Sequence, residues 1–105
     1  RGAWFGAVAS DGRAVGLSTA RLDESGGCRV DGFTHKAYLD TWGALVQAAL
    51  EWAISRNAGP CWAAVSVEDE EKTALFERLG FHKAGPSGQF ELADWTVSSV
   101  RMELR

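Results

Sequence analysis

Residues 61–81, CWAAVSVEDEEKTALFERLGF, form the stretch of sequence that decides the fold. Cys61 to Val67 is short and mostly apolar, which is typical of a strand buried within a sheet. Four acidic residues, 68–71, come next, and the N-terminus of a helix favours negative charge. The helix that follows ends at Gly80, where a glycine in the left-handed conformation stops a helix, and Phe81 can contact the last turn. The stretch therefore predicts a strand, an acidic turn and a short helix.

The first 35 residues contain three apolar, β-prone runs joined by two polar turns: 4–9, 14–22 and 28–35. The first turn contains Asp11-Gly12, a strong signal for a two-residue hairpin turn in which both central residues have positive φ. In the third run the alternation of apolar and polar residues falters at Gly32-Phe33, which indicates either a bulge or the close approach of another backbone. An antiparallel meander of three strands is expected here.

A long helix is expected between the meander and the strand that begins at Cys61. Asp40 or Thr41 is a good N-cap, and Asn57, with Gly59-Pro60 beyond it, ends the helix. Strand, helix and strand make a unit whose crossover is right-handed and whose strands are parallel. The helical stripe recurs at Trp42, Leu45, Val46, Ala49 and Ala53.

The chain is extended again after Phe81. Residues 84–88 are expected to be a loop, 89–92 a strand and 95–104 the last strand, with a bulge near Ser98-Ser99 where the alternation slips. The order is β-β-β-α-β-α-β-β, which predicts an α+β fold with helices packed on a mixed sheet. Residues 1–105 are expected to form one domain.

Composition narrows the function classes. The 105 residues are 46% hydrophobic and 24% charged, with a formal net charge of −3, as in an ordinary globular domain. No cluster of Lys and Arg supports nucleic-acid binding, and no apolar run is long enough to cross a membrane. The start of the chain shows no signal segment, and Cys28 and Cys61 lack metal-ligand spacing. Both are interpreted as buried free thiols of a cytoplasmic protein, with a disulfide or a reactive thiol as the alternative.

The pattern Asp69-x-x-Lys72-x-x-Leu75-Phe76-x-x-x-Gly80-Phe81 resembles the late segment of the GCN5-related N-acetyltransferases, the GNAT superfamily. That segment usually reads N-x-x-A-x-x-L-Y/F-x-x-x-G-F. The predicted element order is also similar to a GNAT domain whose opening strand and first two helices are absent. The chain could then be a fragment or one half of a tandem or dimeric protein. The alternative is a small α+β binding module in which Leu79-Gly80-Phe81 is an ordinary helix stop.

The resemblance implies acetyl-CoA as a cofactor. Family members bind its pantetheine arm beside the strand before the long helix and its pyrophosphate on the N-terminus of that helix, where free N–H groups meet an anion. The family loop Q/R-x-x-G-x-G/A corresponds to Tyr38-x-x-Thr41-x-Gly43, or one residue earlier to Ala37-x-x-Asp40-x-Trp42, so this chain departs from it in either register. The expected cofactor-binding residues are Phe33, Thr34, His35, Thr41, Trp42, Gly43, Asp69 and Phe76.

Catalysis would need a base that takes a proton from the amine acceptor. The resemblance implies that this base lies on the strand that carries Asp31 and His35, so these two residues are the candidates. Phe76 stands where many relatives have a tyrosine that protonates the leaving thiolate. The leading hypothesis is direct transfer of an acetyl group from acetyl-CoA to a small-molecule or peptide amine. The alternative is a non-catalytic GNAT-like structural or dimerisation domain. A homodimer, or packing on another domain, is expected because a sheet without its opening strand exposes an edge.

Overall fold

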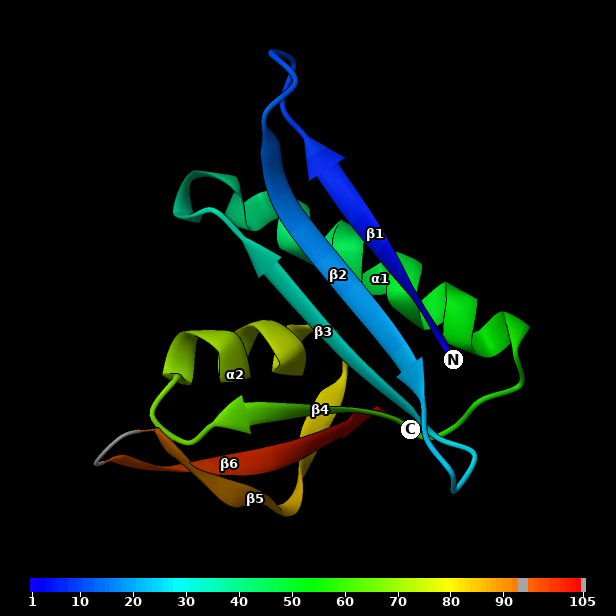
Figure 1. The fold of residues 1–105 in the computed structure, drawn as a ribbon, viewed down its shortest axis with the longest axis vertical. Coiled ribbons are helices and arrows are strands. Elements are labelled where there is room, and N and C mark those ends of the chain that lie inside the picture. The colour runs from blue at the N-terminus through cyan, green and yellow to red at the C-terminus, as the bar shows by residue number, and fades with distance from the viewer. Residues whose placement is uncertain (93–94, 105) are drawn as a thin grey trace. The chain divides into compact units, whose positions relative to one another are not determined.

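The computed structural model describes residues 1–92 and 95–104, and the chain divides into two compact units, residues 1–61 and 62–105 (Figure 1). The six strands belong to one mixed sheet, so the predicted α+β class and element order are confirmed. The elements of the first unit are β1 (Gly2–Val8), β2 (Ala14–Leu22), β3 (Cys28–Thr34), the short 3₁₀ helix η1 (Lys36–Tyr38) and α1 (Leu39–Ser55). The later elements are β4 (Cys61–Ser66), α2 (Glu70–Arg78), β5 (Phe81–Leu92) and β6 (Trp95–Leu104).

The meander of β1, β2 and β3 is antiparallel, as predicted, but its first turn differs from the prediction. The Gly12 N–H donates to Ala9 O (2.9 Å) and the Ala9 N–H to Arg13 O (2.8 Å), and Gly12 has a φ of +88°. Asp11 is not in the left-handed region, so the predicted turn with two positive φ angles is wrong. A three-residue loop with the glycine last takes its place, because one left-handed residue is enough to return the chain to the ladder.

The helix α1 lies against one face of the meander, and small residues on that face let it approach (Figure 1). A Cβ on Gly32 would lie 2.6 Å from Val46 Cγ2, and one on Gly16 would lie 2.7 Å from Leu45 Cδ1. The ladder between β2 and β3 runs without a register shift. The predicted bulge at Gly32 is therefore wrong, and what approaches Gly32 closely is the side chains of Val46 and Trp42 on α1 instead of another backbone.

The helix α1 begins earlier than the sequence predicts. Its N-cap is Tyr38, which makes no side-chain capping bond, and the predicted caps Asp40 and Thr41 lie in the first turn instead. The reason is η1, which tightens the chain directly after β3 and starts the helix sooner. At the other end Asn57 has a φ of +57° and the Ala58 N–H donates to Ala53 O (3.0 Å), so the predicted stop at Asn57 is confirmed.

β4 begins beside β3 within the first unit. The Cys28 N–H donates to Pro60 O (3.0 Å) and the Gly59 N–H donates to Gly26 O (3.0 Å). β3 and β4 are neighbours in the strand order of the mixed sheet, where the parallel pair was expected.

In the second unit, α2 has the ends that the sequence predicts. The Asp69 carboxylate accepts the Lys72 N–H (3.0 Å) as an N-cap. Gly80, with a φ of +97°, donates its N–H to Glu77 O (3.0 Å). The Phe81 ring then packs edge-to-face on Phe76 with 4.9 Å between centroids, which is the apolar contact expected at such a stop.

The long hairpin of β5 and β6 corrects two expectations. Residues 84–88 form no loop but belong to β5, whose pairing with β6 shifts register between Lys83 and Gly85 and between Pro86 and Gly88. The second shift lies opposite Ser99, where an irregularity was predicted, but the additional residue is on β5 instead of β6. Bulges of this kind let a strand contain Pro86, which has no N–H to donate.

Candidate functional site

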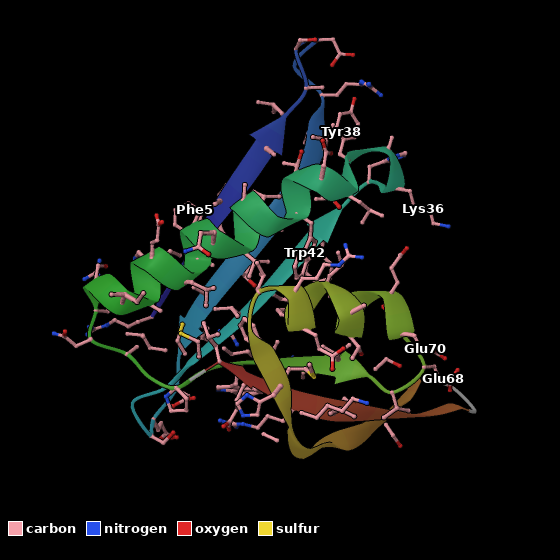
Figure 2. All side chains as sticks on the ribbon, turned by 180° about the vertical axis from the view of Figure 1, so that it is seen from behind. Phe5, Lys36, Tyr38, Trp42, Glu68 and Glu70 are labelled. Carbon is pink, nitrogen blue, oxygen red and sulfur yellow. The ribbon has the colours of Figure 1, made fainter. Side chains whose placement is uncertain are left out.

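The end of β3 and the start of α1 bring most of the predicted cofactor-binding residues into one region of the first unit (Figure 2). His35 is exposed and holds the turn between them, because its Nδ1 accepts the Ala37 N–H (3.4 Å) and its carbonyl accepts the Tyr38 N–H (2.8 Å). The N–H groups of the first turn of α1, which includes Thr41, have no acceptor inside the helix. This turn can therefore meet an anion with its backbone.

Trp42 has a structural task that the sequence does not reveal. Its indole Nε1 donates to Gly32 O (2.8 Å), and its side chain is 3% exposed (Figure 2). The side chain thus fastens α1 to β3, and Trp42 marks where the ladder of α1 begins, since its N–H is the first that can donate to an acceptor inside the helix. At Gly43 an added Cβ would meet no atom within 4 Å, so the space beside this part of the helix is open.

Two buried hydroxyl groups on the α1 face of the meander stand out. Among the described residues, Thr34 Oγ1 and Ser18 Oγ are buried and have no hydrogen-bond partner. A buried polar atom without a partner costs free energy, about 1–3 kcal/mol, and such atoms are rare in native structures. Thr34 was predicted as a cofactor contact and Ser18 was not. The only signal for Ser18 is a hydroxyl at the small-residue position that pairs with Gly32.

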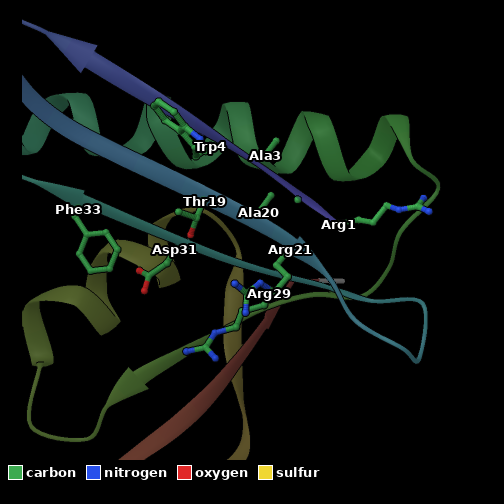
Figure 3. Close-up of a pocket in the computed structure, with 10 residues that line it drawn as sticks. Arg1, Ala3, Trp4, Thr19, Ala20, Arg21, Arg29, Asp31 and Phe33 are labelled. Carbon is green, nitrogen blue, oxygen red and sulfur yellow. The ribbon is translucent and has the colours of Figure 1, made fainter.

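Asp31 and Phe33 lie on the opposite face of β3, because side chains alternate along a strand. Both line a hollow on that face together with Trp4 and Thr19 (Figure 3). The Asp31 carboxylate also accepts the N–H of Gly32 (2.8 Å). The two candidate bases are therefore in different places: Asp31 faces a hollow, whereas His35 caps a turn.

Asp69 and Phe76 belong to the second unit, where each has a structural role. Asp69 caps α2, and Phe76 is 0% exposed and packs on Phe81. A ligand-binding role for either residue remains a prediction.

Cysteines and metal-ligating side chains are the other groups that could carry chemistry in the described part of the chain. Cys28 and Cys61 are both buried, and burial, with a smaller effect of the neighbouring Cys61, raises the pKa of Cys28 to about 11. Burial also raises the pKa of Cys61. Over the described residues, no three metal-ligating side chains gather, and no helix is long and apolar enough to cross a membrane.

Comparison with known proteins gives structural matches only. No model of a protein family matches the sequence, and no curated protein matches it either. Three solved structures illustrate the likeness. They are a chimera of spermidine N-acetyltransferase SpeG from Vibrio cholerae with hSSAT (TM-score 0.81, 16% identity), nourseothricin acetyltransferase (0.85, 21%) and dodecameric spermidine N-acetyltransferase from Vibrio cholerae (0.80, 16%).

Each match covers 98% of this chain and 68%, 64% and 64% of the respective structures, so the chain spans about two thirds of their length. Identity at this level establishes the fold and leaves the substrate open. The chain therefore has the fold of the GCN5-related N-acetyltransferases, as the segment from Asp69 to Phe81 suggested.

Proposed function

We propose that this protein is an acyltransferase that moves an acetyl group from acetyl-CoA directly to an amine. The observation that carries the proposal is the structural match to acetyltransferases over 98% of the chain. The partnerless Thr34 hydroxyl supports it locally, because it lies at the end of β3, where the resemblance assigns the cofactor. That buried hydroxyl can donate to a polar group of a bound ligand, which would remove the cost of its burial.

The start of α1 would hold the diphosphate. Backbone N–H groups of the first turn, up to Thr41, and the positive end of the helix dipole would meet the anion there, beside Trp42 and Gly43. Phe33 and His35 flank Thr34 in sequence. Asp40 is exposed in the same turn, so its carboxylate can turn to solvent, and Lys36 in the preceding turn adds a compensating charge.

Asp31 is the group that we assign as the base. An amine acceptor arrives as an ammonium ion, and its nitrogen must lose a proton before it can attack the acyl carbon. The Asp31 carboxylate, or a water that it holds, accepts this proton in the hollow. The new carbon–nitrogen bond then replaces the carbon–sulfur bond of acetyl-CoA, and the nitrogen loses its second proton to water. The CoA thiolate takes its proton from water, because the Phe76 ring has none to give. Acetyl-CoA supplies the activated acyl group.

The second candidate is a non-catalytic domain that retains the fold and serves in structure or dimerisation. The exposed Asp40 at the start of α1 and the buried Phe76 favour it, since the first weakens anion binding and the second offers no proton. The two candidates differ in whether any amine becomes acetylated.

A transfer assay separates the two candidates. The protein, acetyl-CoA and a mixture of small amines are incubated, and mass spectrometry detects amines that gain an acetyl group. We expect transfer, with kcat reduced about 10²-fold or more in Asp31→Asn, as for loss of a general base. The matched control Asp11→Asn, on the first hairpin turn, should keep the wild-type rate, and His35→Gln should retain most activity. Absence of transfer to every amine by a correctly folded sample would favour the non-catalytic domain.

A further inference from the structure

The face of the meander turned away from α1 carries an ordered set of side chains. Residues that pair across antiparallel strands share a face, so the register defines three rows on it. From the start of β1 these rows are Gly2, Arg21 and Arg29, then Trp4, Thr19 and Asp31, then Gly6, Leu17 and Phe33. Cationic, acidic and aromatic side chains are thus arranged in sequence along one face.

The hollow on this face is large enough for a small molecule. Its volume is about 490 Å³, within the range of ligand pockets, and all its lining residues belong to the first unit (Figure 3). Trp4 is 72% exposed and Phe33 is 53% exposed, so both offer aromatic surface. Gly6 lies next to Trp4 on the same face of β1, and an added Cβ there would meet only Gly16 O at 3.9 Å, so it leaves space beside the indole ring.

The positive charges at one end of the hollow favour the binding of an anion there. Arg21 and Arg29 pair directly across β2 and β3, so their side chains leave the sheet on the same face. Arg1 also lines the hollow, whereas Asp31 supplies its one carboxylate. The net charge of the chain is −3, so this concentration of guanidinium groups is local. An acid group bound at this end would accept charge-assisted hydrogen bonds from the guanidinium groups, each of which has five N–H donors.

We infer that the amine acceptor also carries an acid group, a carboxylate or a phosphate, and an apolar body. This inference rests on the proposed acyl transfer. The acid group lies on the row of Arg21 and Arg29, the body packs against Trp4 and Phe33, and the amine lies near Asp31. Adjacent rows on one face are two residues apart along a strand, or about 7 Å. The acid and the amine of the acceptor are therefore separated by several bonds.

Binding of matched probes tests the inference without acetyl-CoA. The probes are para-aminomethylbenzoate, para-aminomethylphenyl phosphate and the uncharged para-aminomethylbenzamide. The indole N–H signal of Trp4 in NMR spectra, assigned with Trp4→Phe, reports occupancy of the hollow. We expect at least one acid-bearing probe to bind about tenfold more tightly than the amide. Which acid binds more tightly identifies the acid group.

Variants locate the acid group. Arg21→Gln and Arg29→Gln should each abolish the preference over the amide, whereas the control Arg13→Gln, an exposed arginine paired with Asp11, should keep it. Asp31→Asn should keep the preference for the acid-bearing probe, because it changes the amine end that all three probes share, and it should lose acetyl transfer. Equal affinity for all three probes, or a preference that survives Arg21→Gln, would overturn the inference even if transfer to other amines occurs. Tight binding of the acid-bearing probe with no transfer would instead count against the proposed function.

Discussion

The contact between Gly32 and Trp42 shows how single residues fix the relation of α1 to the meander. Gly32 leaves room for the helix, and its carbonyl accepts the indole N–H of a side chain that is almost fully buried. The sequence indicates a close approach at Gly32, but it does not indicate that Trp42 is the partner. An indole on the apolar stripe of a helix fits a packing role and a binding role equally well.

Replacing Trp42 by Phe removes this hydrogen bond and part of the ring volume. The Gly32 carbonyl loses its donor and a cavity forms, so we expect the free energy of unfolding to fall by about 2 kcal/mol. Trp4→Phe is the matched control, because Trp4 is 72% exposed, and its effect should stay below about 0.5 kcal/mol. Urea denaturation measures both values. A similar loss in the two variants would show that the buried contact contributes little.

Cys28 gives a prediction on pH. Burial raises its pKa from 9.0 to about 11, so the folded state holds the thiol proton more tightly than the unfolded state does. The stability that this provides is fully present below pH 9 and is lost as the pH rises toward about 11. Denaturation of wild type and Cys28→Ala at several pH values measures the difference. We expect the wild type to lose more stability than Cys28→Ala between these pH values; parallel curves would contradict the assignment.

At the scale of elements, the ends of α2 were predicted from sequence and the start of α1 was not. Asp69 acts through its own side chain and Gly80 through its own backbone conformation, so a local sequence pattern is enough to identify them. The start of α1 depends on η1, which follows from how β3 ends, and a side-chain cap was expected where none exists. The first hairpin turn was missed for a similar reason, since Asp-Gly fits two loop lengths.

Two glycine-to-alanine substitutions should have opposite effects on stability. Gly80 has a φ of +97°, and an added Cβ would lie 3.2 Å from Leu104 Cδ1, so Gly80→Ala should cost about 1 kcal/mol or more. Gly43 lies inside α1 with open space beside it, and Gly43→Ala should add about 0.5–1 kcal/mol. Thermal denaturation compares the two variants with wild type. If Gly43→Ala destabilised the protein, the open space at the start of α1 would be in question.

At the scale of the whole molecule, the sequence predicted the fold class and the order of elements, but it gave the candidate site only as a set of positions. Neighbours in sequence such as Phe33 and Thr34 lie on opposite faces of β3, so one serves the hollow and the other serves the α1 face. Trp4, Thr19 and Arg21 were not predicted. They reach Asp31 and Arg29 only through strand pairing, which no single stretch of sequence specifies.

The edge strand β1 is the element through which the expected homodimer would form. β1 stands at one end of the strand order, and Val8 at its end is 69% exposed. An exposed edge can pair with a second copy, and a lysine on the edge prevents such pairing. Sedimentation should therefore show a dimer for wild type and a monomer for Val8→Lys. The control Val67→Lys, 50% exposed and outside the strands, should remain dimeric, and a wild-type monomer at high concentration would refute the edge pairing.

Calorimetric titration with acetyl-CoA tests the central claim most directly. Desulfo-CoA and inorganic pyrophosphate serve as the comparison ligands, because they separate the pantetheine arm from the diphosphate. We predict micromolar affinity for acetyl-CoA and for desulfo-CoA, with pyrophosphate alone binding far more weakly, since the β3 end and the α1 N-terminus act together. Thr34→Val, which removes the partnerless hydroxyl and keeps the side-chain shape, should weaken acetyl-CoA binding. Absence of heat at millimolar acetyl-CoA with the folded protein would contradict the account.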